Sequence, residues 1–268
     1  MKTIGITGFT GRVGRHLIAR NRMNYVLLEC DVSNTKDVRK CMEKHKPDLV
    51  LHLAAKSDVD WCEHPDNQKS LSRINLGGTY NILEASEDVG SSVVLLSSDH
   101  IFGGWRGSYK ENHAPYPVNQ YGRSKLAAES LAEVFDNFKI VRTSYLFDYH
   151  RLSYDIQNAI HDIAKSYPVF IKRSFLHLDH FCLQLETYLS SVDSMPKVLH
   201  LTGSQTISWY RFMQNVAVHF HKSKDIIIPR RFPLQSAAPR PLCAGLNSSL
   251  SRTLGIPQFS YLDGIKLL

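Results

Sequence analysis

The sequence predicts an α/β protein, a Rossmann-like doubly wound parallel sheet with a smaller C-terminal lobe. Short β-branched or leucine-rich runs alternate with helix-length segments, and a glycine-rich turn follows the first run directly. Near-continuous apolar strands of this kind are typical of parallel strands that helices cover on both faces. The content of 43% hydrophobic and 21% charged residues is that of a folded globular chain.

Seven runs are the expected strands. They are TIGIT (3–7), YVLLE (25–29), DLVLHLA (48–54), SSVVLLSS (91–98), KIVRT (139–143), PVFIK (168–172) and KVLHLT (197–202). From about residue 146 the alternation loosens and prolines crowd one later stretch. We therefore expect a Rossmann domain at 1–145 and mostly a second lobe at 146–268, with some elements at about 168–205 returning to the sheet.

Charge and cysteine usage argue against several classes of protein. The formal net charge is +7, yet Lys and Arg are scattered rather than massed, which disfavours a nucleic-acid partner. The five cysteines form no C-x-x-C pair and the histidines no metal-binding motif, so we expect neither a disulfide framework nor a metal site. No apolar run approaches the roughly 20 residues of a membrane span, and we expect a cytoplasmic protein without a membrane partner.

Three glycines, Gly8, Gly11 and Gly14, follow the first expected strand and open a helix. Gly8 permits a tight turn, Gly11 lets the backbone approach a pyrophosphate, and Gly14 allows close packing of the helix, whose N-terminus offers free N–H groups to the anion. The alternative is a turn needed only for chain reversal, and the position at the first strand–helix junction favours the phosphate site. The predicted cofactor-binding residues of this turn are Gly8, Thr10, Gly11, Arg12, Val13 and Gly14.

The choice between NAD and NADP stays open. An acid at the end of the second strand would bind the adenosine ribose, and Glu29 and Asp31 compete for that role. The segment at 24–34 is too short for the usual second and third strands with a loop between them. Arg12 and Arg15 either suit a 2′-phosphate or are solvated helix residues, and the sequence favours neither interpretation.

A second motif, VNQYGRSKLAAE at 118–129, places Tyr121 and Lys125 one helical turn apart. They are either ordinary neighbours on a helix surface or part of a site together with Ser97 or Ser98 at the end of an expected strand. A phenol with an ordinary pKa near ~10 needs a nearby ammonium to stabilise its ionised form. The serine hydroxyl would then hold a substrate carbonyl against the phenol, which donates a proton as hydride arrives.

These motifs resemble the extended short-chain dehydrogenase/reductase family, with its T-G-x-x-G-x-x-G turn, its Ser/Thr after a central strand and its Y-x-x-x-K. More narrowly, the chain resembles the dTDP-4-dehydrorhamnose reductase branch over nearly its whole length. SSDHIFGG (97–104) is similar to the branch's S-T-D-Y-V-F-D-G, which assigns the catalytic place to Ser98 and puts His100 where the branch has tyrosine. The resemblance thus implies a catalytic set of Ser98, Tyr121 and Lys125.

The same resemblance implies further binding residues, through LHLAAKSDVDWCEHPD (51–66), RINLGGTYNILEA (73–85) and the R-P motif near residue 240. The implied cofactor contacts are Asp31, Val32, Leu53, Ala54, Ala55 and Asn75, together with Tyr121 and Lys125. The implied substrate contacts are Lys56, Val59, His100, Tyr145 and Arg240.

The function that the resemblance implies is NAD(P)H-dependent reduction of a nucleotide-linked keto-sugar, bound in part by the C-terminal lobe. Sugar dehydration is disfavoured, because His100 stands where the related dehydratases need a glutamate. Two alternatives remain: a nucleotide-sugar epimerase using the same triad, and a non-catalytic dinucleotide-binding regulatory subunit, since a branch relative is the regulatory partner of methionine adenosyltransferase. A homodimer is left open.

Overall fold

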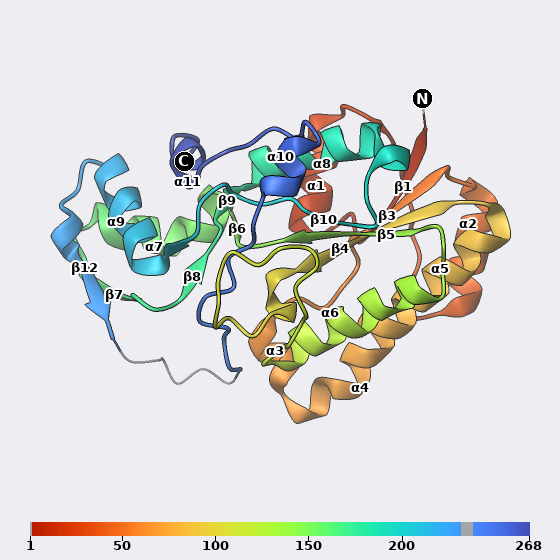
Figure 1. Ribbon diagram of the computed structural model, residues 1–268, viewed down its shortest axis with the longest axis horizontal. Coiled ribbons are helices and arrows are strands. Elements are labelled where there is room, and N and C mark those ends of the chain that lie inside the picture. Colours follow the sequence, from red (N-terminus) through yellow and green to blue (C-terminus); the bar gives the residue numbers. More distant parts are fainter. Residues whose placement is uncertain (1, 232–237) are drawn as a thin grey trace.

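The computed structural model describes residues 2–231 and 238–268 of the chain (Figure 1). In these residues a parallel sheet of six strands runs in the order β2-β1-β3-β4-β5-β10. Its strands are β1 (Thr3–Thr7), β2 (Asn24–Leu27), β3 (Leu49–His52), β4 (Ser92–Ser98), β5 (Phe138–Thr143) and β10 (Val198–His200). The predicted doubly wound parallel sheet is therefore confirmed, and we call it with its helices the sheet lobe.

Helices cover both faces of the sheet, as the apolar strands require. They are α1 (Arg12–Arg20), α2 (Thr35–His45), α5 (Gly78–Val89), α6 (Gln120–Ser130) and α8 (Leu178–Ser190). Helices α1 and α8 pack together on one face, where Ile4, Leu51 and Phe181 share a buried core. Helices α2, α5 and α6 cover the other, around Val50 and Leu83. Figure 1 shows α1 and α8 above the sheet and α5 and α6 below it.

The short segment between β1 and β3 holds one strand, as the sequence indicates. Strand β2 pairs with β1 and leads through a loop into α2, and β3 then lies on the opposite side of β1. The strand order thus reverses direction at β1. In open α/β sheets, ligands bind at the carboxyl ends of the strands beside such a reversal.

The rest of the chain forms a C-terminal lobe, at the left of Figure 1. Its strands pair two by two: β6 (Leu146–Phe147) with β9 (Leu176–His177), β7 (Lys165–Pro168) with β12 (Ile227–Arg230), and β8 (Lys172–Arg173) with β11 (Ile207–Ser208). The helices are α7 (Tyr149–Ile160), α9 (Trp209–His219) and α11 (Tyr261–Ile265). The fully buried rings of Phe175 and Phe212 stack at its centre, with centroids 4.2 Å apart.

The expected strand at 168–172 is wrong. Strand β7 ends at Pro168 and pairs with β12, outside the large sheet, and residues 169–171 between β7 and β8 are not in a strand. The backbone of the run bonds to Arg230 and Trp209 in the C-terminal lobe. An apolar run alone does not say which sheet it joins. From the region 168–205, α8 and β10 do lie with the sheet lobe.

Short elements complete the structure around the carboxyl ends of the strands. They are α3 (Val59–Glu63), α4 (Gln68–Leu71), a π-helix at Ser72–Gly77, a 3₁₀ turn at Asp99–Ile101 and α10 (Ser249–Thr253). None of the helices in the described ranges combines the length and apolar character needed to cross a bilayer.

Candidate active site

The glycine turn after β1 leaves no room for a side chain at Gly8 or Gly14. Gly8 has φ of +63°, and a Cβ there would lie 2.6 Å from the Ala54 nitrogen. A Cβ on Gly14 would lie 2.5 Å from Cα of Phe9, so this glycine lets α1 pack against the turn. Gly11 is the N-cap of α1 and no side chain caps the helix. The N–H groups of its first turn are therefore open to an anion.

A cavity of about 400 Å³ opens beside this turn, between the ends of β1, β2 and β3. Its lining includes six predicted cofactor residues, Gly8, Thr10, Asp31, Val32, Ala54 and Ala55, and Lys56, which is predicted for the substrate. The other predicted cofactor residues lie outside the lining: Gly11, Arg12, Val13, Gly14, Leu53, Asn75, Tyr121 and Lys125. We call this space the glycine-turn cavity.

The side chains of Asp31 and Arg12 have different bonding partners. The Asp31 carboxylate accepts hydrogen bonds from the Ser33 backbone nitrogen and hydroxyl at 2.9 and 2.7 Å, and these bonds lower its pKa. It remains an ionised acceptor beside the cavity. The Arg12 guanidinium donates to the Leu146 carbonyl at 3.0 Å and lies 3.8 Å from Asp148. Arg12 thus joins the sheet lobe to the C-terminal lobe.

The three predicted catalytic residues come together at the edge formed by β4 and α6. Ser98 ends β4, and its hydroxyl lies close enough to the Tyr121 phenol to lower the pKa of that phenol. Lys125 follows one turn later on α6 and is only 4% exposed. Ser97 is buried, and its hydroxyl has no partner among the described residues. Because side chains alternate along a strand, only Ser98 faces Tyr121.

The electrostatics of the triad correct one expectation. Burial is the main cause that raises the pKa of Tyr121, and the Ser98 hydroxyl opposes it; Lys125 is not among the causes. Burial also lowers the pKa of Lys125 to about 8, while the Glu129 carboxylate acts the other way. Tyr121 is therefore held as a protonated phenol.

Asn75 links the lining of the glycine-turn cavity to helix α6. Its carboxamide oxygen accepts from the Lys56 backbone nitrogen at 2.7 Å, and its Nδ2 donates to the Lys56 carbonyl and to the Ser124 hydroxyl. Asn75 lies in the π-helix, a rare element that often marks functional sites. Predicted as a cofactor contact, it links the loop after β3 to the turn of α6 between Tyr121 and Lys125.

Asp99 is a site residue to which the sequence analysis gives no role. It is buried next to Ser98, accepts from the Ser98 and Ser144 hydroxyls at 3.2 and 2.7 Å, and lies 3.3 Å from Nε of Arg173. Arg173 is itself buried in the C-terminal lobe. The position of Asp99 directly after Ser98, the predicted catalytic serine, is a signal in the sequence, whereas nothing in the sequence pairs Asp99 with Arg173.

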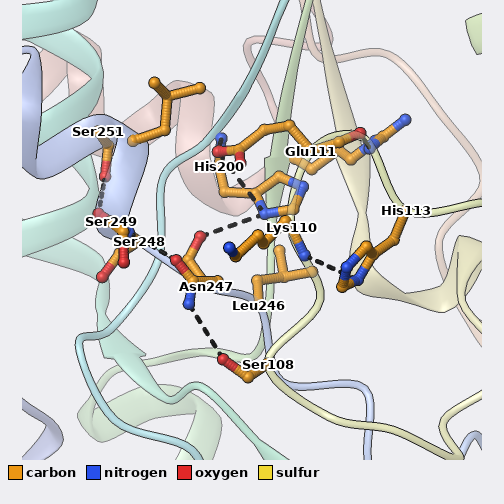
Figure 2. Close-up of polar contacts among 12 residues, drawn as sticks. Ser108, Lys110, Glu111, His113, His200, Leu246, Asn247, Ser248, Ser249 and Ser251 are labelled. Atoms are coloured by element: carbon orange, nitrogen blue, oxygen red, sulfur yellow. Dashed lines mark hydrogen bonds and ion pairs between the residues drawn. The ribbon is translucent and has the colours of Figure 1, made fainter.

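A second buried ion pair joins α6 to β5. Glu129, one turn after Lys125, accepts from Nε and Nη2 of Arg142, with the shortest contact at 2.7 Å. Arg142 also donates to the Glu111 carbonyl. Figure 2 shows His200 between Glu111 and Asn247, with Nδ1 3.3 Å from the Asn247 carbonyl oxygen. Burial lowers the pKa of His200 to about 3, so this network contains a neutral imidazole.

The predicted substrate residues have different structural surroundings. Val59 begins α3, and Arg240 is held in a two-pronged ion pair with the neighbouring Asp60, at 2.7 and 3.1 Å. The His100 and Tyr121 rings meet edge to face, with centroids 5.5 Å apart. Tyr145 packs its ring against Trp209, with centroids 4.6 Å apart, and its hydroxyl accepts from Arg151. Tyr145 is thus part of the aromatic packing of the C-terminal lobe.

A dinucleotide fits the site on three observations: a turn that admits no Cβ, an uncapped helix N-terminus, and an adjoining cavity with an acidic acceptor. No group of three His, Cys, Asp or Glu side chains suited to a metal ion occurs in residues 2–231 and 238–268. The strand order is that of the extended short-chain dehydrogenase/reductase fold, and Ser98, Tyr121 and Lys125 stand at the strand end and on the helix predicted for its triad.

The family follows from comparison with known proteins. A family described as the RmlD substrate binding domain matches residues 1–166, more than half of the chain, and the chain belongs to this family. Methionine adenosyltransferase 2 subunit beta of Xenopus laevis is 24% identical, covering 94% of this chain and 82% of that protein. The dTDP-4-dehydrorhamnose reductase of Aggregatibacter actinomycetemcomitans is 26% identical over 79% of this chain and 77% of its own.

Among solved structures, the dTDP-4-dehydrorhamnose reductase of Bacillus anthracis in complex with NADP superimposes with a TM-score of 0.89. The two chains are 24% identical, and the match covers 99% of this chain and 97% of the other. This similarity confirms the fold over both lobes.

Proposed function

We propose that this protein reduces the keto group of a nucleotide-linked keto-sugar with NADH or NADPH. The observation that carries the proposal is the convergence of Ser98 and Tyr121, with Lys125 buried one turn further along α6. Asn75 joins this helix, through Ser124, to Lys56 in the lining of the glycine-turn cavity. The named reductases in the family support the substrate class, and the NADP bound to the Bacillus anthracis protein supports the cofactor class.

The chain's own residues would carry the proton and the orientation in this reaction. A reduced nicotinamide, when bound, supplies the hydride. Ser98 Oγ would hold the substrate carbonyl oxygen next to Tyr121 Oη, which gives that oxygen its proton as the carbonyl becomes an alcohol. The raised pKa of Tyr121 keeps the proton in place until the oxygen becomes strongly basic. The Lys125 ammonium would then stabilise the phenolate and bind a cofactor ribose hydroxyl.

The remaining binding residues extend this proposal to both lobes. Lys56, Val59, His100, Tyr145 and Arg240 would contact the nucleotide-sugar, and the C-terminal lobe would serve as the substrate-binding lobe. The Asp60–Arg240 ion pair supports this role, because it holds the Arg240 guanidinium beside α3 and near His100, whose pKa the Arg240 charge helps to lower. Free, scattered cysteines support a reducing compartment, and we propose the cytoplasm.

Tyr121→Phe tests the mechanism. We expect kcat to fall by about 10²- to 10⁴-fold, because the proton donor is lost while the ring remains. The measurement is the loss of reduced-nicotinamide absorbance with a panel of 4-keto-sugar nucleotides. Tyr154→Phe, at a ring that is 70% exposed in the C-terminal lobe, is the matched control and should turn over like the wild type. Equal rates for Tyr121→Phe and the wild type would sink the mechanism.

A second candidate is a non-catalytic regulatory subunit. It is favoured by the relatives named methionine adenosyltransferase 2 subunit beta, which match this chain over 94% of its length. This alternative predicts dinucleotide binding without consumption of NAD(P)H on any keto-sugar, and a stable complex with an enzyme partner. The panel assay and co-purification with a methionine adenosyltransferase separate the two functions.

A further inference from the structure

The side chain of Asn119 bonds to the catalytic helix, to the C-terminal lobe and to His100 at once. Its Oδ1 accepts from the Gly122 backbone nitrogen at 2.8 Å. Its Nδ2 donates to the Pro239 carbonyl at 2.9 Å and lies 3.0 Å from Nδ1 of His100. A backbone N–H can only donate and a backbone carbonyl can only accept, so the orientation of the carboxamide is determined by its two backbone partners.

This orientation decides which ring nitrogen of His100 carries the proton. The Asn119 NH₂ group has two hydrogens: one goes to the Pro239 carbonyl, and the other faces Nδ1 of His100. Nδ1 must therefore be the acceptor, and in the neutral ring the proton belongs to Nε2. Burial is the main cause that lowers the pKa of His100 to about 4, so the ring is neutral at physiological pH.

Nε2 is left without a partner among the described residues and is not a fully covered atom. Its ring lies edge-on to Tyr121, two residues after Ser98. The backbone of His100 is equally constrained, because a Cβ on Gly122 would collide with the His100 carbonyl oxygen. Asn119 and the first turn of α6 therefore fix the ring and the backbone of His100 next to Tyr121.

We propose that His100 donates a hydrogen bond from Nε2 to an oxygen of the sugar next to the carbonyl being reduced, and that Asn119 sets this donor. The inference rests on the proposed function and adds a specificity element to it. A tyrosine hydroxyl at this position would both donate and accept. With Nδ1 occupied, His100 only donates, so the group that it selects must be an acceptor such as a hydroxyl oxygen.

The first experiment measures the tautomer without any catalysis. Histidine ring nitrogens are ¹⁵N-labelled in the full chain, and the His100 signals are assigned by their loss in His100→Gln. We expect a protonated Nε2 and an unprotonated Nδ1. In Asn119→Asp, a carboxylate oxygen replaces the NH₂ group, keeps the bond from Gly122 and draws the proton to Nδ1. A protonated Nδ1 in the wild type would overturn the inference.

The second experiment tests the contact with the substrate. His100→Gln places an amide NH₂ near Nε2, whereas His100→Asn retains only the position of Nδ1. With the panel sugar that turns over fastest, we expect kcat/KM to fall by about tenfold in His100→Asn, the worth of one neutral hydrogen bond, and by less in His100→Gln. The same sugar without its hydroxyl next to the keto group should show no difference between wild type and His100→Asn.

Equal losses in the two variants, or an unchanged penalty on the deoxygenated sugar, would overturn the donor role. If no panel member turns over with the wild type, the proposed function fails and the substrate contact fails with it. The nitrogen signals would still decide the tautomer in that case, so the two failures are distinguishable.

Discussion

The two lobes contribute to the site in different ways. The sheet lobe supplies the triad from a seven-residue strand and an 11-residue helix, whose side-chain directions follow from local periodicity. The C-terminal lobe reaches the same place with Arg173 of the two-residue strand β8 and with the segment around Pro239 and Arg240. The chemistry thus lies on regular elements, while the surroundings that would fit the substrate depend on contacts between distant segments.

The largest expected effect comes from the core of the C-terminal lobe. Phe212→Ala removes a fully buried ring stacked on Phe175 and should lower the free energy of unfolding by about 3–5 kcal/mol. Urea denaturation measures this loss. NADH titration at low urea should give an affinity close to that of the wild type, because the glycine-turn cavity lies in the sheet lobe. Loss of NADH affinity in the folded variant would contradict this division between the lobes.

A pH profile examines the triad in the sheet lobe. The pKa of Lys125 is lowered to about 8, and the mechanism needs its protonated form. Reductase activity should therefore be level below this pH and fall tenfold per pH unit above it. In Glu129→Gln the carboxylate that raises the pKa of Lys125 is gone, so the break should move to lower pH. A profile that stays level to pH 10 would show that the Lys125 charge is not required.

The smallest expected effect concerns the cofactor. The ionised Asp31 carboxylate beside the cavity suits a ribose 2′-hydroxyl and repels a 2′-phosphate, and Arg12 is engaged with Leu146. We expect NADH to bind more tightly than NADPH. Asp31→Asn should reduce the ratio of the two affinities about tenfold, which is the effect of losing one charge-assisted hydrogen bond. Calorimetric titration with both cofactors measures this ratio of affinities. Tighter NADPH binding in the wild type would refute this assignment.

Local patterns predicted much of the sheet lobe. The glycine spacing placed Gly8 and Gly14 where a Cβ has no room, and the four-residue spacing put Tyr121 and Lys125 on one face of a helix. The sequence did not reveal that burial dominates the pKa of Tyr121, because desolvation depends on all the segments packed around a side chain.

The C-terminal lobe was less accessible to such reasoning. Its strands have two to four residues, too few for a period to be recognised, and the expected strand at 168–172 fell between two of them. The pairing of Asp99 with Arg173, and of Asn119 with Pro239, joins residues 74 and 120 positions apart. Only the folded chain brings such pairs together.

Helix α1 lies early in the chain, but its side chains bond to residues after position 145. Its N-terminus follows the glycine turn, Arg12 bonds to Leu146, His16 contacts Asp179, and Arg20 pairs with Glu186 of α8. Truncation near residue 145 would strip these partners away and uncover one side of the sheet. The N-terminal segment is consequently no autonomous module for grafting or fusion, and heating should melt the whole molecule in one cooperative step.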